Sequence, residues 1–537
     1  MTGIHRHVLP APRPLLLLPL LLGLGAGLAA CDGAGDAPAD LPALPPRNDA
    51  ASLPPAGEVL TQKRITLAWT GEVRGEIEVC GCPTVPYGGF VRRGQYLTQL
   101  KEQGDPVFVL DAGEMLIKGA KGVRADDQAL RAQTVLTLSR QVGLDAWAPG
   151  PTDLRVRSAV DPAGTSWTDA VAVNVAGFAP TAVLERGGAR IGVVGLSGPL
   201  PGKLLDEDAL VAAVRSAITT VTTPVDGWVV LSNASHAINR RVAEGVPEVG
   251  IVLGTRGEDL DTPTRTTGAP IVEAPDRGRF VSVVRWAIGT KPGPASLVNG
   301  APDARSWEAW DDALERLVLQ TGPARIAEQR RVDSLWDTLS PVAAGRNLVF
   351  VRDRPLGSDL QGEAAISEAV RQFQEASVGA AKSRVAEEQA VRYVSAGSCT
   401  GCHDDYVAAW AATPSHPQAW QALLSRNATT NPECVSCHST GWGEPGGNAS
   451  ADDVAMRTWK AVQCEECHGP MSAHRDDPRR NHGQAVVEAT CVGCHDEANS
   501  PQFDYESYRK RLSCVSLKQN GSTSEAHKPV IGAPASR

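Results

Sequence analysis

The sequence predicts a multidomain chain in which an α/β layered domain precedes a mainly helical and irregular C-terminal segment. Three observations lead to this prediction. The chain has 537 residues, which is more than one ordinary domain holds. Over residues 61–290, short apolar runs rich in Val, Ile and Leu alternate with amphipathic stretches, as they do in α/β folds. Over residues 393–515 regular periodicity fades, and Gly, Pro, Cys, His and Trp dominate.

The first 30 residues have the pattern of an export signal. A polar, partly positive start precedes an apolar run from Leu15 to Leu28, which is short for a membrane span. The sequence Leu-Ala-Ala-Cys that ends at Cys31 resembles a bacterial lipobox, in which the cysteine is lipidated and becomes the first residue. We therefore expect a lipoprotein signal peptide over 1–30 and a lipid anchor at Cys31. An uncleaved anchor or an ordinary signal peptide is the alternative.

Residues 31–60 are rich in Pro, Ala, Gly and Asp and lack apolar periodicity, so we expect a flexible tether. The α/β domain follows. We expect its strands within residues 65–69, 106–113, 190–198, 227–235 and 249–255, and its helices within 88–104, 126–143 and 208–221. Two β-branched runs at 270–275 and 280–289 have no helix between them and are expected to complete the sheets.

Residues 291–392 are more charged, and their apolar residues recur at helical spacing. The pattern is clearest within 306–319, 325–339 and 362–391, where Glu and Arg also pair along the predicted helices. We therefore expect a helical spacer between the α/β domain and the C-terminal segment.

The C-terminal segment repeats one cysteine pattern four times. Eight of the twelve cysteines occur in C-x-x-C-H sequences: Cys399 and Cys402 with His403, Cys434 and Cys437 with His438, Cys464 and Cys467 with His468, and Cys491 and Cys494 with His495. This pattern is typical of covalent haem c attachment, because two thiols on one turn can reach the two vinyl groups while the adjoining imidazole faces the iron. A zinc site would not require histidine directly after each pair. We therefore expect four haem c groups, with the four histidines as axial ligands.

The second axial ligand of each iron decides between an electron carrier and an enzyme, because an open iron can bind and reduce a small molecule. His416 and His474 lie within the segment and are the predicted distal ligands. His482 is a further candidate, and His527 lies in the polar tail at 516–537. We expect the haems to replace much of an ordinary core, with four tryptophans packed against them: Trp410, Trp420, Trp442 and Trp459.

The segment also resembles a known family. The stretches SCTGCHDDYVAAWAATPSHPQAW, ECVSCHSTGWGEPGG and QCEECHGPMSAH are similar to tetrahaem cytochromes of the c-554 type, and the resemblance covers 393–515. It implies periplasmic electron transfer near hydroxylamine oxidation, mostly bis-histidine haems with one iron left open, and His416 and His474 as distal ligands.

The α/β domain resembles a second family. The stretches ITLAWTGEVRGEIE, PVFVLDAGEML, LSNASH and VLGTRGED are similar to the metallophosphoesterase domain of 5'-nucleotidase relatives, over 61–290. The resemblance implies a layered sandwich with a two-metal site at the strand ends, which needs about seven N and O ligands.

Most positions of that metal site carry other residues. The family's Asp-x-His pair is Glu72 and Arg74 in this chain, and four further positions are Glu114, Pro151-Thr152, Asn233 and the stretch 254–258 that includes Arg256 and Glu258. We therefore expect a degenerate domain without phosphoesterase activity. Arg74 and Arg256 could hold an oxyanion in place of the metals, and surface salt bridges are the alternative.

Cys80 and Cys82 form a C-x-C pair near the expected strand ends. In an oxidising compartment such a pair can be a redox dithiol, bind a soft metal or form disulfides elsewhere, with Cys514 as one partner. The residues leave these alternatives open.

The net charge of −9 gives no basic surface for nucleic acid, so redox proteins or a small inorganic molecule are the expected partners. We expect an exported, lipid-anchored tetrahaem cytochrome on the periplasmic face of a membrane, and the sequence leaves open which membrane. An electron carrier is favoured over a catalyst. The alternatives are an oxidoreductase that acts on nitrogen oxides or hydroxylamine-type molecules at an open haem, and a metal-dependent phosphoester hydrolase.

Overall fold

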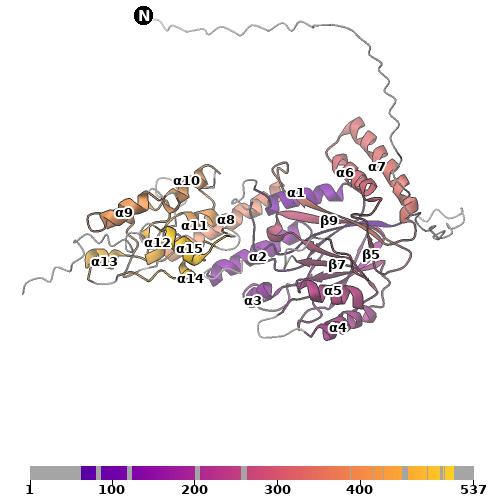
Figure 1. Cartoon of the computed structure of the whole chain (residues 1–537), viewed down its shortest axis with the longest axis horizontal. Coiled ribbons are helices and arrows are strands. Elements are labelled where there is room, and N and C mark those ends of the chain that lie inside the picture. The colour runs from indigo at the N-terminus through magenta and orange to yellow at the C-terminus, as the bar shows by residue number, and fades with distance from the viewer. Residues whose placement is uncertain are drawn as a thin grey trace, which may run out of the picture. The chain divides into compact units, whose positions relative to one another are not determined.

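The computed structural model in Figure 1 divides into Met1–Val59 and Leu60–Arg537, and the residues that it describes all belong to the second unit. The described residues are 62–79, 86–117, 124–199, 206–255, 263–387, 389–413, 415–426, 428–449, 458–479, 482–495, 500 and 502–512. The predicted signal peptide and tether lie outside them, as do several predicted site residues: Cys31, Cys80, Cys82, Arg256, Glu258, Cys514 and His527.

Two β-sheets form the α/β domain. The first has the order β10-β11-β9-β1-β2-β3, and the second has the order β4-β5-β6-β7-β8. In both sheets the neighbouring strands joined by a helix run parallel. The strands of the first sheet are β1 (Arg64–Thr70), β2 (Val107–Asp111), β3 (Ala146–Trp147), β9 (Phe280–Ala287), β10 (Ser296–Leu297) and β11 (Leu348–Pro355). Those of the second are β4 (Thr181–Arg186), β5 (Ala189–Leu196), β6 (Gly227–Ser232), β7 (Val249–Thr255) and β8 (Ile271–Ala274).

The sheets pack face to face on side chains that alternate along the strands. Ile65, Leu67 and Trp69 of β1 lie in the core between the sheets, whereas Ala68 lies in the core on the opposite face. The indole of Trp286 packs directly against the second sheet at Gly227, which has no side chain. A Cβ on Gly227 would lie 2.6 Å from the indole ring. The layered α/β fold that the sequence predicts is confirmed.

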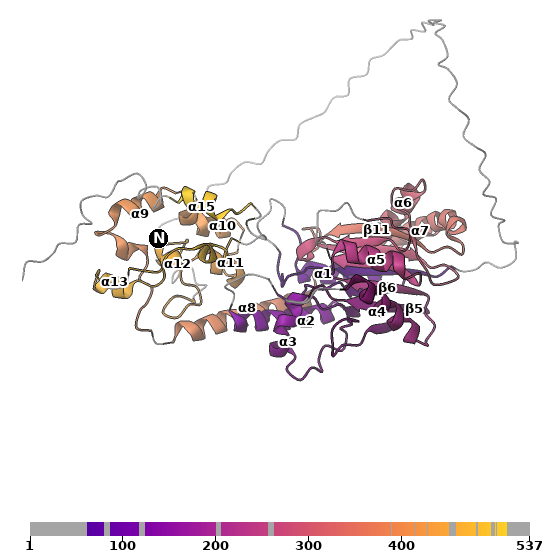
Figure 2. The same ribbon diagram turned by 60° about the horizontal axis from the view of Figure 1, so that its bottom comes forward.

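Helices cover both outer faces, as Figures 1 and 2 show. The first sheet is covered by α1 (Phe90–Lys101), α2 (Ala125–Gln141), α3 (Pro151–Val160) and α8 (Ala364–Val385). The second sheet is covered by α4 (Glu207–Thr220) and α5 (His236–Gly245). The helices predicted within 88–104, 126–143 and 208–221 are therefore confirmed.

The predicted helical spacer over 291–392 is wrong in one important respect. Its helices exist as α6 (Ala304–Leu317), α7 (Gly322–Ala343) and α8, but β11 pairs along its whole length with β9. The α/β domain therefore extends to at least Pro355. The run Leu348–Val351 is short and apolar, and periodicity alone cannot separate a buried strand of this length from a piece of helix.

The C-terminal segment consists of short helices and turns. Its helices are α9 (Asp404–Ala411), α10 (Ala419–Leu424), α11 (Pro432–His438), α12 (Cys464–His468), α13 (Ser472–Asp476), α14 (Glu488–Cys491) and α15 (Tyr505–Arg511). A small apolar cluster lies at its centre and contains the buried side chains of Trp420, Leu423 and Val435. Within the described part of the chain, no helix combines the length and apolar character needed to cross a membrane.

Candidate haem-binding site

Each C-x-x-C-H motif forms about one helical turn. The second and third motifs lie on α11 and α12, and in the first and fourth a backbone N–H closes the turn. His403 N donates to Cys399 O at 3.0 Å, and His495 N donates to Cys491 O at 2.8 Å. This geometry places the two thiols and the imidazole of each motif on neighbouring turn positions, as covalent attachment of a porphyrin requires.

The fold brings motifs from different parts of the segment together. A hydrogen bond joins the thiols of Cys399 and Cys464, which raises the pKa of Cys399 and lowers that of Cys464 to about 7. A similar bond joins Cys437 and Cys494 and raises the pKa of Cys494. The first motif therefore lies beside the third, and the second beside the fourth.

Two pairs of imidazoles from different parts of the segment lie close together. The ring centres of His403 and His474 lie 6.1 Å apart, and those of His416 and His495 lie 6.0 Å apart. Two imidazoles that hold one metal ion from opposite sides, with metal–nitrogen bonds of about 2 Å, place their ring centres about 6 Å apart. Each pair thus consists of one motif histidine and one predicted distal ligand at a separation that fits a single iron.

Hydrogen bonds at Nδ1 orient the motif histidines. His438 Nδ1 bonds Ala419 O at 2.6 Å, and His468 Nδ1 bonds Gln484 O at 3.4 Å. Such a bond keeps the proton on Nδ1 and leaves Nε2 as the metal ligand. Burial, and after it the neighbouring His495, lowers the pKa of His416, which favours the neutral imidazole that metal binding needs.

The other two motif histidines have a different environment. Among the described residues, no second imidazole makes a ring contact with His438 or His468. His482 lies beside His474, with 6.0 Å between ring centres. Its role as a distal ligand stays a prediction.

Of the four tryptophans expected near the haems, three belong to the apolar cluster. Trp420 is buried, and Trp442 and Trp459 pack against it. The Trp410 indole instead donates to Val462 O at 3.0 Å. Contact of these rings with haem stays a prediction.

In the α/β domain, the residues expected at the positions of metallophosphoesterase ligands make internal contacts. Glu72 and Arg74 form an ion pair at 2.9 Å, so Arg74 faces a carboxylate. Glu114 accepts hydrogen bonds from the backbone N and hydroxyl of Thr152. The Asn233 side chain donates to Ala112 O and Ala148 O and accepts from Gly198 N, at 3.0, 3.1 and 2.6 Å. Within the described ranges, no group of three or more His, Cys, Asp or Glu is arranged to hold a metal ion.

These loops nevertheless keep an unusual backbone. Glu72, Arg74 and Glu114 all have positive φ angles, of 50°, 50° and 55°. Non-glycine residues rarely adopt this conformation, and it concentrates at functional sites. The loops thus adopt a strained backbone, while Glu72 pairs with Arg74 and Glu114 accepts from Thr152.

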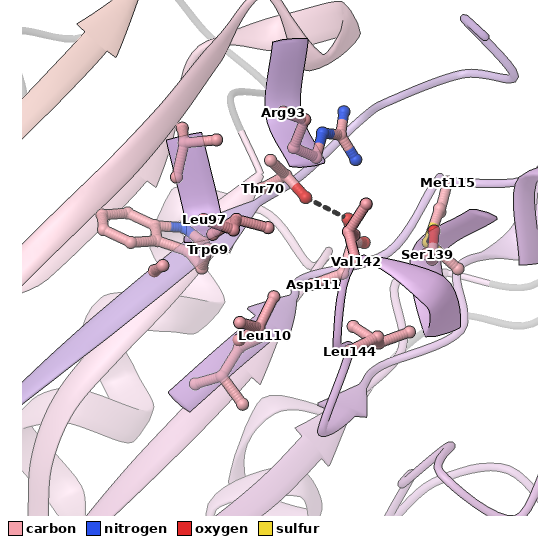
Figure 3. Close-up of a pocket in the computed structure, with 13 residues that line it drawn as sticks. Trp69, Thr70, Arg93, Leu97, Leu110, Asp111, Met115, Ser139, Val142 and Leu144 are labelled. Atoms are coloured by element: carbon pink, nitrogen blue, oxygen red, sulfur yellow. Dashed lines mark hydrogen bonds between the residues drawn. The ribbon is translucent and has the colours of Figure 1, made fainter. Parts of the chain in front are cut away.

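A small cavity lies behind these loops, between β1, β2 and the helices (Figure 3). Its volume of about 10 Å³ suits a single water molecule. Burial raises the pKa of Asp111 to about 7, although Thr70 Oγ1 and Gly113 N donate to its carboxylate at 2.6 and 2.7 Å. Burial also lowers the pKa of the nearby Arg93 to about 10. The sequence reasoning missed both residues, although Asp111 lies in the predicted strand PVFVLDAG and ends β2.

Comparison with known proteins shows which family the C-terminal segment resembles. Residues 398–469 match the family model described as cytochrome c554 and c-prime. These residues contain three of the four attachment motifs and His416. Over these residues the segment is therefore similar to multihaem c-type cytochromes.

One curated relative is the cytochrome c-554 of Nitrosomonas europaea, which is 31% identical over 139 residues. The match covers 23% of this chain and 57% of that cytochrome, so the chain spans little more than half of its relative.

Two solved structures, both of proteins from Thermus thermophilus, are similar at lower identity. The 5'-nucleotidase precursor from this organism is 17% identical, with a TM-score of 0.40 and 62% of each chain covered. Its sulfate thiohydrolase SoxB is 14% identical, with a TM-score of 0.41 and coverage of 60% of this chain and 62% of the SoxB chain.

Proposed function

We propose that the protein is an exported, membrane-anchored cytochrome that binds four haem c groups and transfers electrons through them. The observation that carries this proposal is the pairing of His403 with His474 and of His416 with His495 at about the span of one iron. Each pair joins an attachment motif to a histidine outside it. A bis-histidine iron is closed to substrates and suits electron transfer.

The residues of the segment have separate tasks in this function. Bound haem supplies the one-electron chemistry. The eight motif thiols would hold the porphyrins as thioethers, and each motif imidazole would supply one nitrogen ligand to an iron. The backbone carbonyls of Ala419 and Gln484 fix the tautomer of His438 and His468. The buried Trp420 packs with Leu423 and Val435 in the apolar cluster of the segment.

The test is the mass and the redox-titrated spectrum of full-length protein made in a host that attaches haem c. We expect the added mass of four haems and reduced-minus-oxidised bands of low-spin haem. A mature chain with no added porphyrin mass would refute the proposal. A chain with fewer than four would refute the haem count.

A second candidate function is reduction or oxidation of a small inorganic molecule at an open iron. The observation that favours it is the environment of His438 and His468, which contact no second imidazole among the described residues. An open haem predicts a high-spin electron paramagnetic resonance signal that nitric oxide or cyanide abolishes. Uniformly low-spin haem would exclude this function.

The membrane anchor and the periplasmic location rest on the lipobox-like sequence that ends at Cys31. We expect the wild-type protein in the membrane fraction and Cys31→Ser in the soluble periplasmic fraction, because a diacylated cysteine binds bilayers firmly. Partner proteins would then be redox proteins of the same compartment. Equal membrane binding of the two forms would contradict the lipid anchor.

A further inference from the structure

The helix that carries the second attachment motif begins against the α/β domain. Asn431 is the N-cap of α11, and its Oδ1 accepts from Glu433 N at 2.9 Å. Its Nδ2 donates to Glu78, which follows β1, and Glu78 also accepts from Gln374 Nε2 of α8 at 2.7 Å. One carboxylate of the α/β domain therefore joins α8 to the first turn of α11.

A second contact is a mostly buried ion pair. Arg131 of α2 pairs with Glu433, and the two side chains are 16% and 12% exposed. The guanidinium also donates to Gly75 O at 2.8 Å and lies 5.5 Å from the Phe373 ring. Burial lowers the pKa of Arg131, but the Glu433 carboxylate, together with Glu76 and Asp127, outweighs this effect and the pKa is raised. Loss of either partner would leave an uncompensated charge in a poorly solvated place.

A third contact fixes the loop after the motif. Arg384 of α8 donates from Nε to Gly443 O at 2.9 Å, and its Nη1 pairs with Asp127 at the start of α2 at 3.0 Å. The second motif thus lies between two contacts to the same pair of helices. This arrangement limits any movement of Glu433 relative to Arg131.

Glu433 directly precedes Cys434, so its charge acts on the haem attached at Cys434 and Cys437. Reduction lowers the charge of a haem by one, and a nearby lone carboxylate disfavours it because the local dielectric constant is low. We propose that Arg131 is a positioning residue of the electron-transfer chain. It holds α11 and neutralises Glu433, and it thereby keeps the potential of the second haem higher than a lone carboxylate would allow. This inference rests on the proposed function.

The experiment is a spectroscopic redox titration of full-length, haem-loaded Arg131→Gln, Glu433→Gln and the double variant, at about pH 8 so that a lone carboxylate stays ionised. Arg131→Gln should lower the potential of one haem, and Glu433→Gln should raise it. The double variant should return close to wild type. A tenfold change in the ratio of oxidised to reduced haem corresponds to about 59 mV for one electron.

The matched control is Arg140→Gln, which removes another arginine of α2 that is paired with a carboxylate, Asp169, at 2.8 Å. Its potentials should equal those of wild type.

Opposite shifts that cancel in the double variant cannot arise from a merely structural role. If the Arg131→Gln protein does not accumulate, the haem potential of Glu433→Gln tests the inference. A potential of Glu433→Gln that is lowered or unchanged relative to wild type overturns it. Protein without haem overturns the proposed function and this inference with it, whereas loaded protein with unshifted potentials overturns the inference alone.

Discussion

The imidazole rings of His416 and His495 lie 6.0 Å apart, with 49° between their planes, although one belongs to the loop after α9 and the other to the last attachment motif. His495 Nδ1 is held by Ser500 Oγ at 2.8 Å, so its Nε2 is the nitrogen left for a metal. The fold of the chain thus brings the imidazoles of His416 and His495 close together.

Replacing His416 by Ala should open one iron. We expect one haem of the loaded protein to change from low to high spin, because an axial nitrogen is lost, while haem content stays the same. Electron paramagnetic resonance measures the change. His236→Ala is the control, since His236 pairs with Glu273 in the α/β domain at 3.0 Å. An unchanged spectrum for His416→Ala would mean that another residue opposes His495.

His474→Ala should open a different iron, the one attached at the first motif, because His474 faces His403. The double variant with His416→Ala should therefore have twice the high-spin signal of either single variant. A double variant with the signal of one single variant would show that both histidines serve the same haem.

The α/β domain should not hydrolyse phosphoesters. Glu72 is engaged by Arg74 and Glu114 by Thr152, so two metal-ligand positions are occupied by internal bonds. We expect no release of nitrophenol from nitrophenyl phosphate above the level without enzyme, with or without added manganese. Hydrolysis that depends on manganese and is lost in Glu114→Gln would disprove this.

Asn233 occupies a position at which the resemblance to metallophosphoesterases leads us to expect a metal-ligand histidine. We expect Asn233 to stabilise the fold instead. Its side chain ties the ends of β2, β3 and β5 through three backbone groups. We expect Asn233→Ala to lower the free energy of unfolding by roughly 1–3 kcal/mol, since those groups lose their partners. Urea denaturation measures this. The exposed Gln329→Ala, which removes a bond to Asp333, should change it by less than about 0.5 kcal/mol.

Asp111 should make stability depend on pH. Its folded pKa of about 7 lies above the ordinary value of 3.8, so the folded state binds more protons between these values. Its contribution to stability is therefore full below about pH 4 and is lost as the pH rises through about 7, with a slope of at most about 1.4 kcal/mol per pH unit. Asp111→Asn should remove this slope from the unfolding free energy. If the unfolding free energy of Asp111→Asn declined with pH as steeply as that of wild type, another group would cause the effect. One such group is Asp153, whose pKa burial raises to about 8.

Local patterns in the sequence predicted local structure well. The strands and helices expected up to residue 290 reappear in the structure because each run folds by its own periodicity, whereas β3, β4, α3 and α5 were not expected. The strand β11 was missed because its pairing with β9 joins residues far apart in the chain, which no local window contains. The same limit applies to Arg131 and Glu433, whose ion pair joins α2 to α11.

The sequence by itself predicted where haem attaches, because a C-x-x-C-H motif places two thiols and an imidazole within one turn whatever surrounds it. It also predicted that the α/β domain lacks the metal ligands of the metallophosphoesterases it resembles, since residue identity alone decides which atoms can bind a metal. Only the tertiary structure decided that His474 faces His403, that His416 faces His495, and that Arg74 faces Glu72. These partners meet through the long-range folding of the chain, and their separation along the sequence carries no information about distance in space.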